Sequence, residues 1–176
     1  MAQATLVQSE HRTSAAMDKE GKYLTFALGN EEYGLEILKV REIIGFMDIT
    51  AVPQMPPYIK GVINLRGQVI PVIDLRAKFS MASAEVTEQT CIIVVEITQQ
   101  GRKFNTGIVV DHVSEVLDIA GENIEESPQF GSDVKSDFIL GMGKVGDKVK
   151  ILLDIDKVLA AVDIQALNAS ENSNKI

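Results

Sequence analysis

An internal repeat limits the folds that are open to this chain. The apolar stretch from Gly61 to Asp74 is echoed by a second stretch from Gly141 to Asp154, and both pairs stand 80 positions apart (141 − 61, 154 − 74). Each stretch is interrupted once by a short polar turn that contains glycine. Two similar stretches predict two similar modules. The seam between such modules is a natural place for a partner to dock.

A second echo lies upstream of the first. The stretch from Gly34 to Ile43 resembles the stretch from Gly107 to Val116 at an offset of 73 positions (107 − 34). Each half offers four or five short strands and one helical turn. So little sheet cannot bury both of its faces when flat, whereas curling into a small barrel removes most exposed edges. The expected fold is therefore all-β, with two small barrels packed side by side.

The composition narrows the function classes. The 176 residues, 45% of them hydrophobic and 24% charged, favour a globular chain with a sizeable core. A formal net charge of −8 argues against a nucleic-acid backbone as partner. We see no apolar run of membrane-spanning length and no signal-peptide core, so a cytoplasmic protein is expected. The single cysteine, Cys91, excludes an internal disulfide and is expected to be a packed, unreactive thiol.

The polar ends predict tails around one folded region. Residues 1–21 are expected to form a flexible leader and residues 163–176 a similar tail. The region between them, residues 22–162, is expected to divide into a first barrel at about 22–88 and a second at about 89–162. Strands can cross from one barrel to the other.

Local patterns predict turns, caps and one short helix. Tight hairpin turns are expected at Arg66-Gly67 and at Gly146-Asp147. The aspartates that end the two repeats are expected to cap short helices. The segment Leu38–Ile44 places its apolar residues at helical spacing and predicts a short helix. Its echo, residues 113–119, can be a helical turn, or a strand because its β-branched content is high.

Catalytic and metal-binding patterns are nearly absent. His11 lies in the leader, and His112 follows Asp111, but neighbours on a strand point to opposite faces. One cysteine and two distant histidines do not make a metal site, and no serine-nucleophile elbow occurs. We therefore expect no enzymatic activity, no cofactor and no metal. Arg66, at a hairpin tip, is either an ordinary surface arginine or a charge-assisted anchor for a partner's carboxylate or carbonyl.

Several segments fall in the order and spacing of a known family. They are residues 26–29, 31–34, 37–43, 59–67, 69–76, 107–111 and 113–117. In these segments the chain resembles the CheW family of chemotaxis coupling proteins, and the resemblance covers about residues 22 to 162.

The resemblance implies a fold and a set of partners. It implies two SH3-like five-stranded barrels around a shared hydrophobic core, with short helical turns, in a non-catalytic adaptor. Such adaptors bridge transmembrane chemoreceptors to the histidine kinase CheA, in the cytoplasm at arrays on the inner face of the membrane. The receptor's helical hairpin tip is expected in a groove between the barrels. The kinase regulatory domain is expected mainly on the second barrel, at residues that no motif identifies.

The positions that match receptor-contacting positions of the family are Val40, Glu42, Gly61 and Arg66. Val40 is expected as the apolar floor of the groove and Arg66 as a polar clamp at its rim. Gly61, which has no Cβ, would let the receptor helix approach the backbone closely.

Two other functions remain open at this point. One is a coupling protein of a related, non-flagellar signalling array, which the neighbouring genes would distinguish. The other, from a different class, is a barrel that binds single-stranded nucleic acid. That alternative predicts a basic, aromatic-rich groove, whereas the aromatic residues here do not interleave with basic ones.

Overall fold

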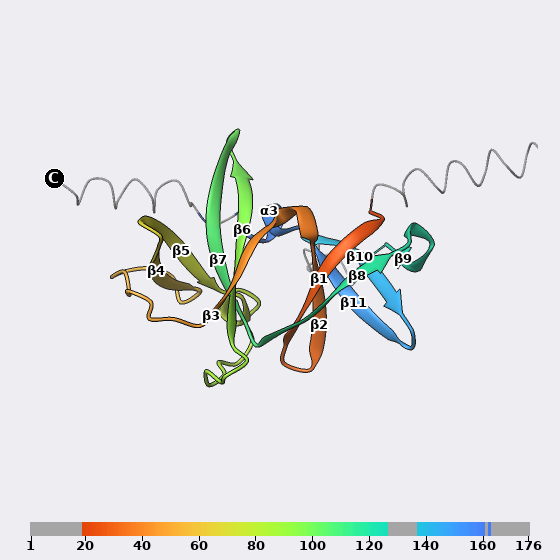
Figure 1. Ribbon diagram of the computed structural model, residues 1–176, viewed down its shortest axis with the longest axis horizontal. Helices are drawn as coiled ribbons and strands as arrows, with labels where there is room; N and C mark the ends of the chain where they lie inside the picture. The colour runs from red at the N-terminus through yellow and green to blue at the C-terminus, as the bar shows by residue number, and fades with distance from the viewer. Residues whose placement is uncertain (1–18, 127–136, 161, 163–176) are drawn as a thin grey trace, which may run out of the picture.

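The computed structural model describes residues 19–126, 137–160 and 162. Its strands form two groups that lie side by side (Figure 1). The described chain is mainly strand with a few short helical turns, so the all-β prediction is confirmed. The predicted tail at residues 163–176, and all but the last three residues of the predicted leader at 1–21, lie outside the described residues.

The middle of the chain forms a five-stranded sheet, here called the central sheet, with the order β3-β6-β7-β5-β4. Its strands are β3 (Val40–Gly45), β4 (Ile59–Leu65), β5 (Gln68–Asp74), β6 (Cys91–Gln99) and β7 (Arg102–Val110). Neighbouring strands are antiparallel except β5 and β7, which are parallel.

The two ends of the described chain form a six-stranded sheet, here called the terminal sheet, with the order β8-β1-β2-β11-β10-β9. Its strands are β1 (Gly21–Leu28), β2 (Glu31–Glu36), β8 (His112–Ile119), β9 (Ile124–Glu125), β10 (Ile139–Val145) and β11 (Lys148–Leu153). The pair β2 and β11 is parallel and the other pairs are antiparallel. Both sheets therefore follow one plan, in which two hairpins meet at a parallel pair.

The two halves of the sequence exchange hairpins. The hairpin β1–β2 pairs with β11 of the second half, and the hairpin β6–β7 pairs with β5 of the first half. The predicted boundary between barrels at about residues 88 and 89 therefore does not follow the sheets. Residues 40–110 supply the central sheet, and residues 21–36 and 112–153 supply the terminal sheet. Each hairpin docks on the other half, which is the crossing of strands between barrels that the prediction allowed.

The sequence repeat is also a structural repeat. Gly34 faces Leu152 in one parallel pair, and Gly107 faces Val72 in the other. These partners differ by the offsets of 73 and 80 positions that the sequence shows. A Cβ at Gly34 would lie 2.8 Å from Leu152 Cδ2, and one at Gly107 would lie 3.5 Å from Val72 Cγ2. Glycine therefore lets hairpin β1–β2 seat closely on its parallel partner, whereas at Gly107 the tight contact is with Ile92 of the same hairpin, 2.8 Å from the Cβ position.

Each repeat ends in a capped turn of helix, as predicted. Asp74 accepts hydrogen bonds from two backbone amides of α2 (Leu75–Lys78) at 3.0 and 3.5 Å. Asp154 accepts one from α3 (Ile155–Val158) at 3.3 Å. Two 3-10 turns, η1 (Ile37–Lys39) and η2 (Gly121–Asn123), precede β3 and β9.

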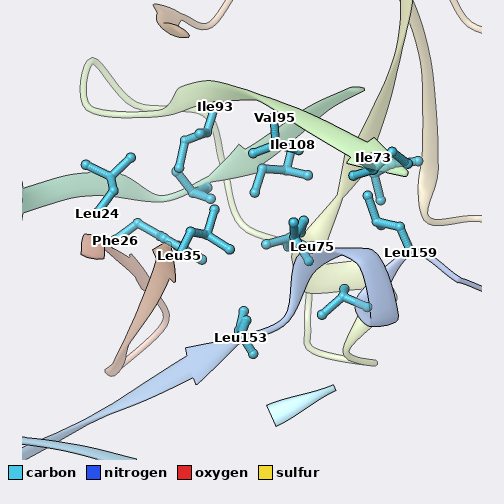
Figure 2. Close-up of a cluster of buried hydrophobic side chains, with 14 of the residues drawn as sticks. Leu24, Phe26, Leu35, Ile73, Leu75, Ile93, Val95, Ile108, Leu153 and Leu159 are labelled. Carbon is cyan, nitrogen blue, oxygen red and sulfur yellow. The ribbon is translucent and has the colours of Figure 1, made fainter. Parts of the chain in front are cut away.

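The main core lies between the two sheets and draws on both. Its members, which Figure 2 shows converging, include Leu24, Phe26, Leu35, Ile73, Leu75, Ile93, Val95, Ile108, Leu153 and Leu159. Smaller clusters fill the curl of each sheet, one around Ile70 and Val94, the other around Tyr23 and Leu152. Because burying one large aliphatic side chain contributes about 2 kcal/mol, the shared core should make the two sheets unfold together.

The helix predicted at Leu38–Ile44 is wrong, because most of this segment is strand β3. A β-bulge at Arg41 shifts the pairing of β3 with β6. The extra residue puts Val40 and Ile43, three positions apart, on the same face of the strand. That spacing imitates a helix in the sequence. The echo at residues 113–119 is also a strand, and β8 carries a bulge in its pairing with β1.

Candidate protein-interaction site

Glu42 and Arg66 meet although 24 positions separate them in the sequence. Strand β3 places Glu42 opposite Val94, on the face that curls around the small cluster of the central sheet. Arg66 occupies the turn between β4 and β5. Its Nη1 donates to Glu42 Oε1 at 2.9 Å, and its Nη2 donates to Glu42 Oε2. This bidentate ion pair links edge strand β3 to the β4–β5 turn.

The ion pair is open to solvent, with 72% of the Arg66 side chain and 29% of the Glu42 side chain exposed. The hydrogen bonds from Arg66 hold the pKa of Glu42 below its usual range, so this carboxylate stays charged at mildly acidic pH. A solvent-screened pair contributes little to stability. The guanidinium can therefore exchange Glu42 for a carboxylate or carbonyl of a partner at small cost.

The backbone at Arg66 has a conformation that glycine favours. Its φ is +52°, and Gly67 follows with a φ of +87°. Two-residue hairpin turns with both φ values positive prefer Gly, Asn or Asp. The equivalent turn in the second repeat has Gly146, with a φ of +60°, at the position of Arg66. An arginine here raises the cost of the turn, which indicates that its side chain serves another purpose.

Val40 and Glu42 do not share a face of β3. The bulge at Arg41 lies between them, so Val40 pairs with Val95 and packs against the main core, while Glu42 faces the other side. The structure therefore does not bring Val40 together with the ion pair. Val40 supports β3 from the core side instead.

Gly61 is buried, and the chain's own backbone fills the space beside it. A Cβ at Gly61 would lie 2.0 Å from the carbonyl oxygen of Thr50 and 3.0 Å from the Cα of Ala51. Backbone hydrogen bonds join Thr50 and Val62 in both directions at 2.9 Å. The expected reason for a glycine here, an open approach for a partner helix, is wrong. Gly61 is needed because Thr50 packs against it and because its φ is +143°.

A shallow hollow of about 440 Å³ lies beside the ion pair. A second ion pair, between Arg41 and Glu96, borders it, and Lys103 Nζ lies 3.8 Å from Glu96 Oε1. The lining includes Arg41, Glu42, Leu65, Arg66, Gln68 and Glu96. Small-molecule sites are mostly apolar and enclosed. This charged, open surface is better suited to another polypeptide.

The equivalent place on the terminal sheet lacks the ion pair. Glu115 stands at the position of Glu42, 73 residues on, and Gly146 stands at the position of Arg66, 80 residues on. A glycine supplies no cation, yet the same hairpin forms there. The Glu42–Arg66 pair is therefore not required to build the module, which favours a functional role for it.

Exposed apolar side chains lie on the same edge of the central sheet. Leu38, in η1, is 89% exposed, and Ile43, on β3, is 43% exposed. The sequence pattern placed Ile43 on the buried face of a helix and did not single out Leu38. The repeat holds a signal for Leu38, because the second copy has the charged residue Asp111 at that position.

Neither His112 nor Cys91 lines the hollow beside the Glu42–Arg66 pair. His112 begins β8, and the neighbouring Asp111 engages Arg76 rather than an imidazole. His11 lies outside the described residues. Across residues 19–126 and 137–160 no group of three or more His, Cys, Asp or Glu could hold a metal ion. Cys91 packs half-buried against the main core.

Within the described residues, none of the helices has the length and apolar character that a membrane span needs.

Known proteins resemble this chain in sequence and in fold. Residues 22–163 match the family model of the CheW-like domain. The chemotaxis protein CheW of Klebsiella aerogenes is 42% identical over 143 residues, which are 81% of this chain and 84% of that protein. The probable chemotaxis protein CheW of Rhizobium etli is 34% identical over 143 residues, 81% of this chain and 90% of that protein.

A solved structure agrees with these relatives. The crystal structure of the scaffolding protein TtCheW from Thermoanaerobacter tengcongensis aligns with a TM-score of 0.70 at 36% identity, and the alignment covers 80% of this chain and 92% of that one. The family match spans both sheets and includes the Glu42–Arg66 pair. The chain therefore belongs to the CheW family of chemotaxis coupling proteins.

Proposed function

We propose that this protein is a non-catalytic adaptor that couples transmembrane chemoreceptors to the histidine kinase CheA at the cytoplasmic face of the membrane. Membership of the CheW family supports this role. The observation that best supports the location of the receptor site is the Glu42–Arg66 ion pair. It is solvent-exposed, it stands on a turn that glycine would favour, and it is absent from the second repeat.

The receptor binds at the edge of the central sheet that carries this pair. A helical hairpin tip can lay an apolar stripe on the sheet edge, as amphipathic helices do in other complexes. Leu38 and Ile43 supply exposed apolar surface, and burying a side chain such as Leu38 would contribute roughly 2 kcal/mol. Arg66 supplies a charge-assisted hydrogen bond at the rim.

Val40 and Gly61 affect receptor binding without direct contact. Val40 anchors β3 to the main core and thereby fixes the position of Glu42, which projects from the opposite face of the strand. Gly61 lets Thr50 pack against β4, the strand that leads to Arg66. Substitutions at these two positions would move the ion pair rather than remove a receptor contact.

The kinase regulatory domain binds the terminal sheet. Two partners that are held at the same time need two surfaces, and the terminal sheet presents the second copy of the module without the ion pair. Each contact is weak when alone. Because an array presents many copies, avidity would raise the effective affinity and recruit the protein to the inner face of the membrane.

Titration of isotope-labelled protein tests the proposal. We expect a receptor tip fragment to shift amide signals around Arg66 and β3, and the kinase regulatory domain to shift signals of the terminal sheet. Single-stranded DNA serves as the control and should shift neither. Shifts from both protein partners on one surface would contradict the two-surface adaptor, and shifts from DNA alone would favour the nucleic-acid alternative.

A further inference from the structure

Two ion pairs join the halves of the sequence at similar places in the two modules and with opposite polarity. In the first, Arg76 of α2 donates to Asp111, which follows β7, at 2.7 Å from Nε and 2.5 Å from Nη2. In the second, Lys39 of η1 donates to Asp156 of α3 at 2.6 Å. Arg76 and Asp156 differ by 80 positions, the offset of the repeat (156 − 76). In the first pair the cation lies on the short helix that ends a repeat. In the second pair it lies on the turn that follows a hairpin.

A backbone amide completes each pair at the same position of the module. Gly29 N donates to Asp111 Oδ2 at 2.8 Å, and Thr98 N donates to Asp156 Oδ1 at 2.8 Å. The registers of β1–β2 and β6–β7 align Gly29 with Thr98, 69 positions on (98 − 29). Each carboxylate therefore holds the end of one hairpin's first strand together with a cation. The two clusters resemble one another with their side-chain charges reversed, although the residues that follow the hairpins are one position out of register, because Asp111 aligns with Leu38 rather than Lys39 (111 − 73).

The parallel seats of the two hairpins are alike in residue type. Both β2 and β7 present a glycine, Gly34 or Gly107, to a branched aliphatic residue on the parallel partner strand, Leu152 or Val72. Hairpin β1–β2 would find a seat of the same kind on β5 of its own half. Hairpin β6–β7 would find one on β11. The residue types at the seats therefore do not by themselves select one pairing.

We infer that the reversed polarity of the Lys39–Asp156 and Arg76–Asp111 pairs selects the exchanged pairing of hairpins. If each hairpin docked on its own half, Lys39 would meet Arg76, and Asp111 would meet Asp156. Two attractive pairs would become two like-charge pairs, which are destabilising. All four side chains are between 18% and 32% exposed, so solvent screens them less than it screens Arg66. The inference concerns folding and is independent of the proposed adaptor role.

Refolding of the full-length chain tests this inference. The double variant Lys39→Glu/Asp156→Arg gives both pairs the same polarity. It keeps attraction in the native pairing and removes the repulsion from the alternative one. The chain is unfolded in urea and refolded by dilution, and an amide correlation spectrum measures the fraction with non-native signals. We expect this fraction to rise roughly tenfold over the natural sequence, as two like-charge contacts become favourable.

Three further variants separate the choice of pairing from local damage. Lys39→Arg/Asp156→Glu keeps the polarity and should refold like the natural sequence. Arg76→Glu/Asp111→Arg, which reverses the other pair alone, should raise the non-native fraction. Adding Lys39→Glu/Asp156→Arg to it should lower that fraction again, because like-charge contacts return to the alternative pairing. The inference is overturned if the first double variant refolds like Lys39→Arg/Asp156→Glu. It is also overturned if combining the two reversals raises the non-native fraction further.

Discussion

Gly61→Ala should destabilise the protein by about 4 kcal/mol, although it adds a single methyl group. A φ of +143° is a conformation that alanine adopts only at a cost of about 2 kcal/mol. The new Cβ would lie 2.0 Å from the Thr50 carbonyl oxygen, so Thr50 must move away. The two backbone hydrogen bonds between Thr50 and Val62 would then be lost, at about 1 kcal/mol each.

Urea unfolding followed by circular dichroism measures this loss against two controls. Gly146→Ala adds a Cβ in open space at a φ of +60° and should cost only about 1 kcal/mol. Gly141→Ala meets Glu125 O at 2.9 Å but has no φ in the left-handed region, so its cost should fall between the other two. Equal losses of unfolding free energy in Gly61→Ala and Gly146→Ala would contradict this prediction, because the Thr50 contact would then add nothing to the loss at Gly61.

Three other variants test separate parts of the structure. Arg66→Gly should leave the urea midpoint unchanged or higher, because glycine suits a φ of +52°, and should weaken binding of a receptor tip fragment roughly fivefold without affecting kinase binding; equal losses for both partners in calorimetric titrations would count against the site. The pKa of Asp111 is held below its ordinary value of 3.8, chiefly by hydrogen bonds from Arg76, so its stabilising contribution is complete above about pH 5 and is lost as the pH falls through the lowered pKa. Asp111→Asn should therefore make the free energy of unfolding less dependent on pH in that acidic range, and an unchanged slope would contradict this. The buried Thr106 hydroxyl has no hydrogen-bond partner among the described residues, so Thr106→Val should raise the free energy of unfolding by about 1 kcal/mol; a loss of stability would mean that the hydroxyl is satisfied.

The repeat made much of the fold predictable. The repeated apolar stretches and their glycine-containing turns located the β4–β5 and β10–β11 hairpins, and Asp74 and Asp154 cap helices where the pattern placed them. The exchange of hairpins was not predictable from these patterns, because Gly34 and Gly107 occupy equivalent positions and give both hairpins the same sequence signal. On our inference, the charges of Lys39, Arg76, Asp111 and Asp156 distinguish the two hairpins. These residues are far apart in the sequence, and their contacts are seen only in the folded structure.

The candidate site was also predictable only in part. The resemblance named Glu42 and Arg66, but their pairing depends on a bulge at Arg41 that a one-dimensional pattern reads as helical spacing. The burial of Gly61 depends on Thr50, which is bridged to the neighbouring Val62 by backbone atoms alone. Backbone contacts of this kind leave no side-chain pattern in the sequence.

Co-sedimentation with receptor-bearing vesicles tests the adaptor role most directly. Vesicles that carry a chemoreceptor are mixed with the kinase, with or without this protein, and the kinase in the pellet is measured. We predict that the kinase sediments well above background only when the protein is present, and that Arg66→Gly lowers this recruitment several-fold while still binding kinase in solution. Recruitment that is the same without the protein, or unchanged by Arg66→Gly, would contradict an adaptor that holds the receptor through this ion-paired edge.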